Sequence, residues 1–493
     1  MRILLVYPKY PDTFWSFKYA LRFISKKAAY PPTGLLTVAA MLPGHWEKRL
    51  VDLNVQDLED ADLEWADMVL ISAMLIQDKS SREIIRRSKE KGKKVVAGGP
   101  AFTSQPENYP DVDHLVLNEA ETTLPLFLQD LEHGQARRIY ASRERPSLDR
   151  TPIPDWSLID MKKYASMAIQ YSRGCPYKCE FCDIVIMNGR RPRTKSPEQM
   201  IREVEALYTS GWRGSLFIVD DNFIGNKRKV KKMLARLQEW QSRYNYPFVL
   251  FTEASVDLAD DQELLDLMRR SNFNKVFLGL ETPNKSSLLE CGKNQNTVGD
   301  MVKAVEKIHK NGMLVMGGFI IGFDNDNESI FESQFRFIQQ SGVVTAMVGL
   351  LGALPRTRLW ERLKQEGRLL HDSPTGENTD GSINFIPKMG TETLLSGYQQ
   401  LVSTIYSPKN YYQRIEIFLK SYTPTSRTRI TRQDIKALVR SIWRIGIFSR
   451  NAPWFWKVML KTSVTKTRAL PEVIQLSIFG YHFQRIYRRC QNL

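Results

Sequence analysis

The chain is 493 residues long, with 42% hydrophobic and 25% charged residues, which is enough for about two or three globular domains. No uninterrupted apolar run approaches the ~18 residues needed to cross a bilayer. The longest, residues 68–76, is typical of a buried strand. Residues 1–8 lack the long apolar stretch and small-residue cleavage site of a secretory signal. We therefore exclude a membrane-spanning protein and expect a cytoplasmic one.

The first 140 residues alternate short apolar strands with helices, which predicts a parallel sheet covered on both faces, as in Rossmann-like α/β domains. Ligands of such sheets bind at the carboxyl ends of the strands. A proline-rich linker is expected at 141–165. The strands are expected near 2–7, 48–53, 67–73, 94–97 and 114–117, and the helices near 34–42, 79–91 and 121–132.

A second alternating series fills residues 166–377, and its six βα units predict a partial (β/α)6, TIM-like barrel. Residues 378–493 form a third, helical and basic domain, with helices expected at 391–405, 409–419 and 431–448. The barrel strands are expected at 167–172, 215–220, 248–253, 275–280, 314–321 and 345–351, with helices at 197–209, 227–243, 261–271, 298–311 and 328–341.

Three of the five cysteines, Cys175, Cys179 and Cys182, follow the first barrel strand in a C-x3-C-x2-C spacing. Thiolates are the ligands of iron–sulfur clusters, and three of them can hold a [4Fe–4S] cluster while leaving its fourth iron open. The alternative is structural zinc, which prefers four protein ligands. No histidine lies between His133 and His309 to complete such a site, so we favour the cluster. The isolated Cys291 and Cys490 are interpreted as structural.

The phrase at 171–183, with Phe181 between the last two cysteines, resembles the signature of the radical S-adenosylmethionine (SAM) superfamily. The resemblance implies that SAM chelates the open iron, is split by one electron to a 5′-deoxyadenosyl radical, and places its adenine near Phe181. The alternative role of Gly279 and Gly318 is to avoid steric crowding among the side chains packed inside the barrel. The resemblance places further SAM contacts at the ends of later strands, on Asp220, Asp221, Glu253, Ser255, Gly279, Glu281 and Gly318.

The phrases at 31–36, 95–100 and 117–121 precede the cysteine motif in an order similar to cobalamin-binding domains of radical SAM enzymes. Asn54 stands where some cobalamin domains carry a cobalt-binding histidine, so we expect no histidine ligand from this position. A degenerate domain that binds nothing remains the alternative. The resemblance implies cobalamin contacts from Thr33, Gly34, Ser72, Gly98, Gly99 and Glu119.

Residues 409–493 hold 17 Lys and Arg against three acids, and so carry most of the net charge of +16. One interpretation is a helical cap over the barrel. Basic helices with interleaved aromatic residues also suit an anionic membrane surface or RNA. We favour peripheral membrane contact, at the inner membrane face. We do not expect nucleic acid, because the tRNA methylthiotransferases that share the cysteine motif have different flanking domains.

The whole chain resembles the cobalamin-dependent radical SAM branch that contains the hopanoid C-2 methylases, in phrases such as 170–183, 219–226 and 354–358. The resemblance implies a C-methyltransferase acting on an unactivated carbon of an apolar or lipid-like small molecule. The deoxyadenosyl radical would remove hydrogen, methylcobalamin would deliver methyl, and flavodoxin or ferredoxin would donate electrons. The alternatives are a radical cyclase or oxidative ring-former that uses cobalamin without methyl transfer, and a non-enzymatic cluster or cobalamin sensor.

Overall fold

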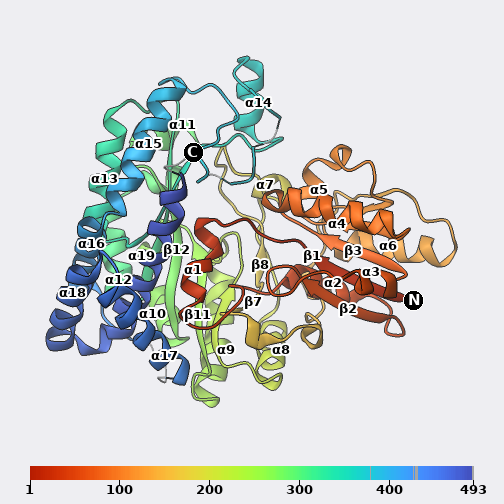
Figure 1. Ribbon diagram of the computed structural model, residues 1–493, viewed down its shortest axis with the longest axis horizontal. Coiled ribbons are helices and arrows are strands. Elements are labelled where there is room, and N and C mark those ends of the chain that lie inside the picture. The colour runs from red at the N-terminus through yellow and green to blue at the C-terminus, as the bar shows by residue number, and fades with distance from the viewer. Residues whose placement is uncertain (373, 378, 426, 428–430, 491–493) are drawn as a thin grey trace.

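The computed structural model describes residues 1–372, 374–377, 379–425, 427 and 431–490. The remaining positions of the expected barrel and C-terminal domain lie outside the described residues. The described chain forms two six-stranded parallel sheets and a block of C-terminal helices (Figure 1). The expected α/β class, with a Rossmann-like sheet, a partial barrel and a helical C-terminal part, is confirmed.

The N-terminal sheet has the strand order β2-β1-β3-β4-β5-β6, and all its neighbours pair in parallel. The chain therefore adds β2 on one side of β1 and the later strands on the other side. Ligands of such sheets bind at the carboxyl ends of the strands beside this change of side. The strands are β1 Arg2–Tyr7, β2 Glu47–Asp52, β3 Met68–Ser72, β4 Lys94–Gly98, β5 His114–Val116 and β6 Ile139–Tyr140; the helices are α1 Lys18–Leu21, α2 Thr33–Met41, α3 Asp60–Trp65, α4 Asp78–Glu90, α5 Pro100–Ser104 and α6 Ala120–Glu132.

The barrel sheet has the order β14-β13-β12-β11-β10-β7, so the chain adds each strand beside the previous one. Its strands are β7 Met167–Ile169, β10 Gly214–Ile218, β11 Phe248–Ala254, β12 Phe273–Glu281, β13 Leu314–Ile321 and β14 Thr345–Leu350. Its helices are α7 Ile184–Met187, α8 Pro197–Thr209, α9 Lys227–Arg243, α10 Gln262–Arg270, α11 Lys285–Glu290, α12 Met301–Lys310, α13 Ser329–Ser341 and α14 Arg358–Gln365.

The first barrel strand ends at Ile169, so the prediction that it continues to residue 172 is wrong. The backbone N–H of Tyr171 donates to the Asp220 carboxylate at 2.7 Å, which takes it out of the parallel ladder. The next two residues, β8 Ser172–Arg173, pair antiparallel with β9 Arg193–Thr194. This small hairpin encloses the cysteine motif.

The C-terminal helices are α15 Thr391–Ile405, α16 Pro408–Ser421, α17 Arg432–Ser441, α18 Ala452–Thr465 and α19 Leu470–Cys490. Thr431 caps α17, because its side chain accepts the N–H of Asp434. The helix expected to run to residue 448 changes to a π-helix at Ile442–Ile447. The carbonyl of Gly446 in that turn accepts a hydrogen bond from Trp456 Nε1 at 2.9 Å, so a side chain of α18 binds the widened turn.

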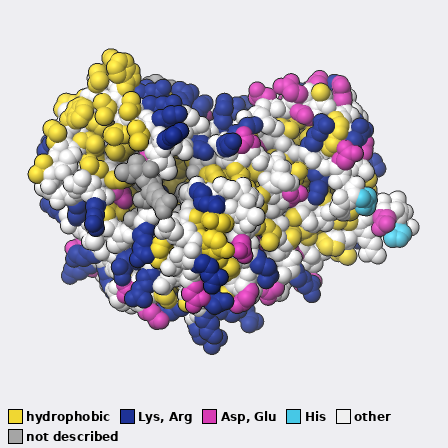
Figure 2. Space-filling model, turned by 90° about the horizontal axis from the view of Figure 1, so that it is seen from below, with side chains coloured by type: hydrophobic (Ala, Val, Ile, Leu, Met, Phe, Trp, Pro, Cys, Tyr) yellow, Lys and Arg dark blue, Asp and Glu magenta, His cyan; other side chains and the backbone are white. Residues whose placement is uncertain are grey.

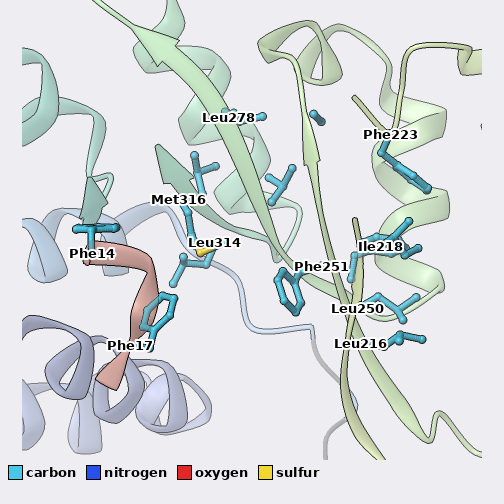
Figure 3. Close-up of a cluster of buried hydrophobic side chains, with 14 of the residues drawn as sticks. Phe14, Phe17, Leu216, Ile218, Phe223, Leu250, Phe251, Leu278, Leu314 and Met316 are labelled. Atoms are coloured by element: carbon cyan, nitrogen blue, oxygen red, sulfur yellow. The ribbon is translucent and has the colours of Figure 1, made fainter. Parts of the chain in front are cut away.

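The segment between β1 and α2, residues 8–32, packs between the barrel and the C-terminal helices. Figure 1 shows its helix α1 beside α19, although the two are at opposite ends of the sequence. Phe14 is fully buried and stacks on Phe483 with ring centroids 4.0 Å apart. Its carbonyl lies 2.9 Å from Nε2 of the buried His482. Figure 3 shows Phe14 and Phe17 beside Leu314 and Met316 of β13, so one core joins both ends of the chain to the barrel.

We expect Phe14→Ala to lower the free energy of unfolding by about 3–5 kcal/mol, because it leaves a cavity in this shared core. Phe448→Ala is the matched control: Phe448 is 69% exposed, so its loss should change the free energy by less than about 0.5 kcal/mol. Urea denaturation of the purified chain measures both. Equal destabilisation by the two variants would contradict this account of the core.

Candidate active site

The cysteine motif forms a loop between β8 and α7 whose start is fixed by backbone geometry. Gly174 adopts φ +95°, and a Cβ there would lie 2.8 Å from the carbonyl oxygen of Gly189. The N–H of Cys175 donates to the same carbonyl at 3.1 Å. Only glycine fits this close approach, so Gly174 fixes the direction in which the chain enters the motif.

Two predicted site residues, Asp220 and Asp221, hold this entrance from the end of β10. Asp221 accepts hydrogen bonds from the Gly174 N–H at 3.0 Å and from Asn188 Nδ2 at 2.9 Å. Asp220 accepts from Tyr171 N–H at 2.7 Å and from the Ser172 hydroxyl at 2.6 Å. Burial raises the pKa of Asp220 to about 7, although these donors act in the opposite direction. Both carboxylates therefore shape the loop, and the predicted contact with SAM stays a prediction.

The three cysteine side chains are partly buried, and the donor set around them suits a cluster better than one ion. Among the described residues, no three His, Cys, Asp or Glu side chains converge to bind a single metal ion. Zinc would require such convergence, with sulfur ligands about 2.3 Å from one centre, whereas a cubane takes one thiolate at each iron. Burial raises the pKa of the Cys182 thiol to about 12 and also raises that of Cys179. A bound metal would favour the thiolate form of these side chains.

A polar group beside Cys175 includes a residue that sequence reasoning did not single out. Asn222 Nδ2 lies 3.8 Å from the Cys175 sulfur and 3.2 Å from the hydroxyl oxygen of the predicted residue Ser255. The amide Oδ1 of Asn222 is buried and finds no hydrogen-bond partner in the described part of the chain. Nearby, burial and repulsion from Asp221 raise the pKa of Glu253 to about 8. These acceptors fit the amino end of a cationic ligand such as SAM.

A second group surrounds Cys179 and includes the unforeseen Lys293. Lys293 forms an ion pair with the buried Glu281, and its ammonium lies 6.0 Å from the ring centroid of Phe181. A Cβ on Gly279 would lie 2.5 Å from both charged groups, so this glycine makes room for the pair. Phe181, Gly279 and Glu281 therefore lie close together, and their predicted contacts with SAM stay a prediction.

Gly318 lies apart from this group. A Cβ on it would lie 2.8 Å from the ring of Phe277, so its neighbour is an aromatic side chain inside the barrel. This contact matches the packing alternative. The predicted contact of Gly318 with SAM remains a prediction.

The loops predicted to bind cobalamin meet at the carboxyl edge of the N-terminal sheet. Ser72 pairs with Gly98 in register, and a Cβ on Gly99 would lie 2.7 Å from the Ser72 hydroxyl oxygen. Thr33 begins α2, where its hydroxyl lies 3.3 Å from the carbonyl of Ala168 in β7. A Cβ on Gly34 would meet nothing within 4 Å. Gly34 therefore faces open space, whereas Gly99 packs closely against Ser72.

Asn54 is held by its own loop. Its Nδ2 donates to the Pro8 carbonyl at 3.2 Å and to Asp52 at 2.7 Å, and its Oδ1 accepts the Tyr10 N–H at 2.9 Å. All three contacts lie within the N-terminal sheet's loops. This amide joins the ends of β1 and β2.

One pocket lies between the predicted cobalamin loops and the cysteine motif. Its lining comes from loops after β3, β4 and β5 on one side, and from α7 and the segment after β14 on the other. The lining residues are Leu75, Thr103, Ser104, Asn118, Asp183, Ile186, Met187, Leu354, Pro355 and Arg356. The carboxyl edge of the N-terminal sheet therefore faces the segment that directly follows the cysteine motif.

Glu119, predicted to contact cobalamin, is engaged in ion pairs across the two sheets. Its carboxylate oxygens lie 2.8 Å from Arg173 and 2.7 Å from Arg193. Arg173 also pairs with Glu121 at 2.8 Å. All four side chains are at least 85% buried, with exposed fractions of 3–15%. Because Arg173 lies two residues before Cys175, these pairs tie the cysteine loop to the N-terminal sheet.

Comparison with known families gives three matches along the chain. Residues 169–338 match the radical SAM superfamily, and residues 22–128 match the B12 binding domain. Residues 357–493 match a domain of unknown function, DUF4070. The first two matches cover the cysteine loop and the strand-end loops that face it, which defines the class as a radical SAM protein with a B12-type domain.

Curated relatives match nearly the whole length. The chain is 45% identical to an uncharacterized methyltransferase of Synechocystis sp., over 92% of this chain and 86% of that protein. It is 35% identical to the hopanoid C-2 methylase of Rhodopseudomonas palustris, over 99% and 94%. The chain belongs to the family of radical SAM enzymes with a B12-binding domain that includes this methylase.

Solved structures share the fold. The methyltransferase TsrM from Kitasatospora setae, with cobalamin and a [4Fe–4S] cluster bound, superposes with a TM-score of 0.61 at 15% identity, over 85% of this chain and 99% of that one. OxsB, with aqua-cobalamin and SAM bound, gives 0.61 at 13% identity, over 100% and 80%.

The expected enzyme class is confirmed, namely a cobalamin-dependent radical SAM enzyme of the methyltransferase family, with a [4Fe–4S] cluster, SAM and cobalamin as its cofactors. A small-molecule substrate agrees with the methylase relatives. In the described part of the chain, no helix combines the length and apolar character needed to cross a bilayer.

We expect Cys175→Ala, Cys179→Ala and Cys182→Ala each to lower bound iron and sulfide at least about ten-fold after anaerobic reconstitution, because a thiolate at each iron is needed for retention. Cys291→Ala is the matched control, since Cys291 is a buried cysteine that is not part of the C-x3-C-x2-C motif, although its apolar cluster packs against Phe181. Iron and sulfide analysis of the purified chains checks this. Full iron content in any of the three variants would contradict the ligand assignment.

The Glu121–Arg173 pair predicts a stability loss in acid. Burial alone would raise the pKa of Glu121, but Arg173 lowers it from 4.5 to about 2. Because the pKa of Glu121 is lower in the folded than in the unfolded chain, its ionised form stabilises the fold above the unfolded pKa of about 4.3. The stabilisation is on the order of 3 kcal/mol, and it is lost as the pH falls toward 2. Glu121→Gln should therefore destabilise the chain at pH 7 and flatten its stability between pH 5 and 2.

The control for that experiment is Glu132→Gln, at the exposed end of the same helix α6. Denaturant unfolding across this pH range should leave it indistinguishable from the parent. If Glu121→Gln kept the parent's pH slope, the pair would have no part in acid stability.

Proposed function

We propose that this protein is a C-methyltransferase that acts on an unactivated carbon of an apolar, lipid-like small molecule. One observation carries the proposal: the segment directly after the cysteine motif and the loops at the carboxyl edge of the N-terminal sheet line one pocket. A substrate carbon held there could be reached from both sides. Hydrogen abstraction and methyl delivery need this common access, because each reagent is bound by a different part of the chain.

The residues would divide between the cofactors as follows. Cys175, Cys179 and Cys182 would hold the cluster, and the strand-end loops at Ser72 and Gly98 would hold cobalamin. When bound, the cluster with SAM supplies a hydrogen-abstracting radical and cobalamin supplies the methyl group. The SAM-binding set combines the predicted and newly found residues, namely Phe181, Asn222, Glu253, Ser255, Gly279 and Glu281.

Aromatic side chains inside the barrel support an apolar substrate. Tyr30 lies 5.3 Å from Phe217, and Trp15 lies 5.4 Å from Phe277, measured between ring centroids. These four side chains are only partly buried. Trp15 and Tyr30 belong to residues 8–32, and Phe217 and Phe277 belong to the barrel strands, so the rings lie where that segment meets the barrel. Partly exposed rings in such a position suit contact with a large apolar molecule. The hopanoid named for the relative from Rhodopseudomonas belongs to that class.

Two partners complete the proposal. A reductant such as flavodoxin or ferredoxin would supply the electron that the cluster needs. Residues 409–493 would contact a membrane surface, where an apolar substrate is concentrated. Their excess of Lys and Arg supports an anionic surface.

The test uses anaerobically reconstituted enzyme with cobalamin, a reductant, methyl-labelled SAM and a hopanoid lacking the C-2 methyl group, together with a total lipid extract. We expect label in a lipid product, with 5′-deoxyadenosine and S-adenosylhomocysteine formed. Cys179→Ala should abolish all three, while Cys291→Ala should retain them.

Two outcomes would favour the rivals. A modified product without label, accompanied by deoxyadenosine, would indicate a cyclase. Complete absence of SAM cleavage by a chain that carries its cluster would indicate a sensor. Either result overturns the methyltransferase proposal.

A further inference from the structure

The outer face of the C-terminal helices carries a cluster of exposed apolar side chains. It spans α17, the π-helix and α18, which we call the apolar ridge. Figure 2 shows hydrophobic side chains gathered at the end of the molecule formed by the C-terminal helices, with Lys and Arg beside them. The ridge residues and their exposed fractions are Ile435 54%, Val439 60%, Trp443 60%, Ile447 54%, Phe448 69%, Trp456 37%, Leu460 63% and Val464 86%.

The sequence spacing puts these side chains on one face of each helix. Residues 435, 439, 443 and 447 follow one another at intervals of four, as do residues 456, 460 and 464. The intervening Ile445 and Phe455 are fully buried and anchor the two helices to the core. The sequence therefore provides an inner apolar stripe for packing and a separate outer one.

The ridge is held in a defined shape by its own contacts. Trp443 and Phe448 meet edge to face with ring centroids 5.0 Å apart. Trp456 Nε1 donates to the Gly446 carbonyl at 2.9 Å, which joins α18 to the π-helix. The exposed side chains are thus presented on a fixed scaffold.

The charge around the ridge is mostly positive, and Lys457 and Lys461 of α18 pair with Glu416 of α16. Residues 431–468 contain nine Lys and Arg and one acid, Asp434. Asp434 is engaged by Thr431 in the helix cap. Lys436 and Arg450 are exposed and make no ion pair with the residues that the structure describes. The unpaired cations match the anionic headgroups of a membrane surface, and the exposed aromatic and aliphatic side chains match its apolar layer.

We propose that the apolar ridge docks onto the surface of a bilayer containing anionic phospholipids, lying in the plane of the headgroups. Trp443 and Phe448 would occupy the interfacial region, and Leu460 and Val464 would reach the acyl chains. An RNA ligand would use the cations but leave these aliphatic side chains exposed. This inference deepens the membrane contact of the proposed function, and it does not depend on the proposed methyl transfer.

The experiment is flotation of the full-length, cluster-loaded chain with vesicles of phosphatidylglycerol and phosphatidylcholine, compared with pure phosphatidylcholine. We expect at least about ten-fold stronger partitioning onto the anionic vesicles, weakened by salt. Trp443 should shift its fluorescence to shorter wavelength on binding. Its signal is isolated by comparison with Trp443→Phe.

Paired variants separate the two contributions. Phe448→Ser with Leu460→Ser should lower binding at least about ten-fold. Lys436→Gln with Arg450→Gln should lower it by about five-fold for each charge and reduce the salt dependence. The matched control combines Leu126→Ser and Lys79→Gln, exposed positions on α6 and α4 of the N-terminal sheet. All variants should keep the parent's iron content and thermal unfolding midpoint.

Three results would overturn the proposal. One is binding to anionic vesicles that the ridge variants do not weaken. Another is absence of vesicle binding with concentration-dependent self-association, which would make the ridge an interface between copies of this chain. The third is selective binding of RNA that the Lys436 and Arg450 substitutions abolish, with no vesicle binding.

Discussion

The buried ion pairs between Glu119, Glu121, Arg173 and Arg193 are the constraint on which the active-site arrangement depends. They connect the start of α6 in the N-terminal sheet to the hairpin that encloses the cysteine loop. Removing one partner from a buried pair leaves an uncompensated charge, which costs several kcal/mol. The relative position of the two sheets is therefore defined where their functional edges face each other.

The pKa of a buried acidic residue in this molecule depends on whether a cationic side chain lies beside it. Glu121 is paired with Arg173, which keeps it ionised. Glu253 is enclosed beside other carboxylates, and its pKa is raised to about 8. A group of acids that repel one another favours a cationic ligand, because binding relieves the repulsion. This contrast supports SAM binding at the end of β11.

The two faces of the C-terminal helices have different environments. Their inner face closes the core with Phe14 and Phe483, so the N-terminal segment, the barrel and α19 share one apolar interior. Their outer face leaves Phe448 and Val464 exposed. A helix with apolar residues on both faces commonly contacts a second apolar partner. The division explains how one basic domain can both complete the fold and offer a docking surface.

The sequence by itself determined the α/β class, the order of strands and helices, and the cysteine loop, because periodicity and motif spacing are local properties of the chain. It also identified the strand-end loops that form the pocket. It did not single out Asn222 or Lys293, because their contacts with Ser255 and Glu281 form only when the segments at the strand ends come together. Nor could it show that Glu119 pairs with two arginines, or that Val439 and Trp443 are exposed while Ile445 is buried. Those features depend on which surfaces meet in space, and tertiary packing alone decides that.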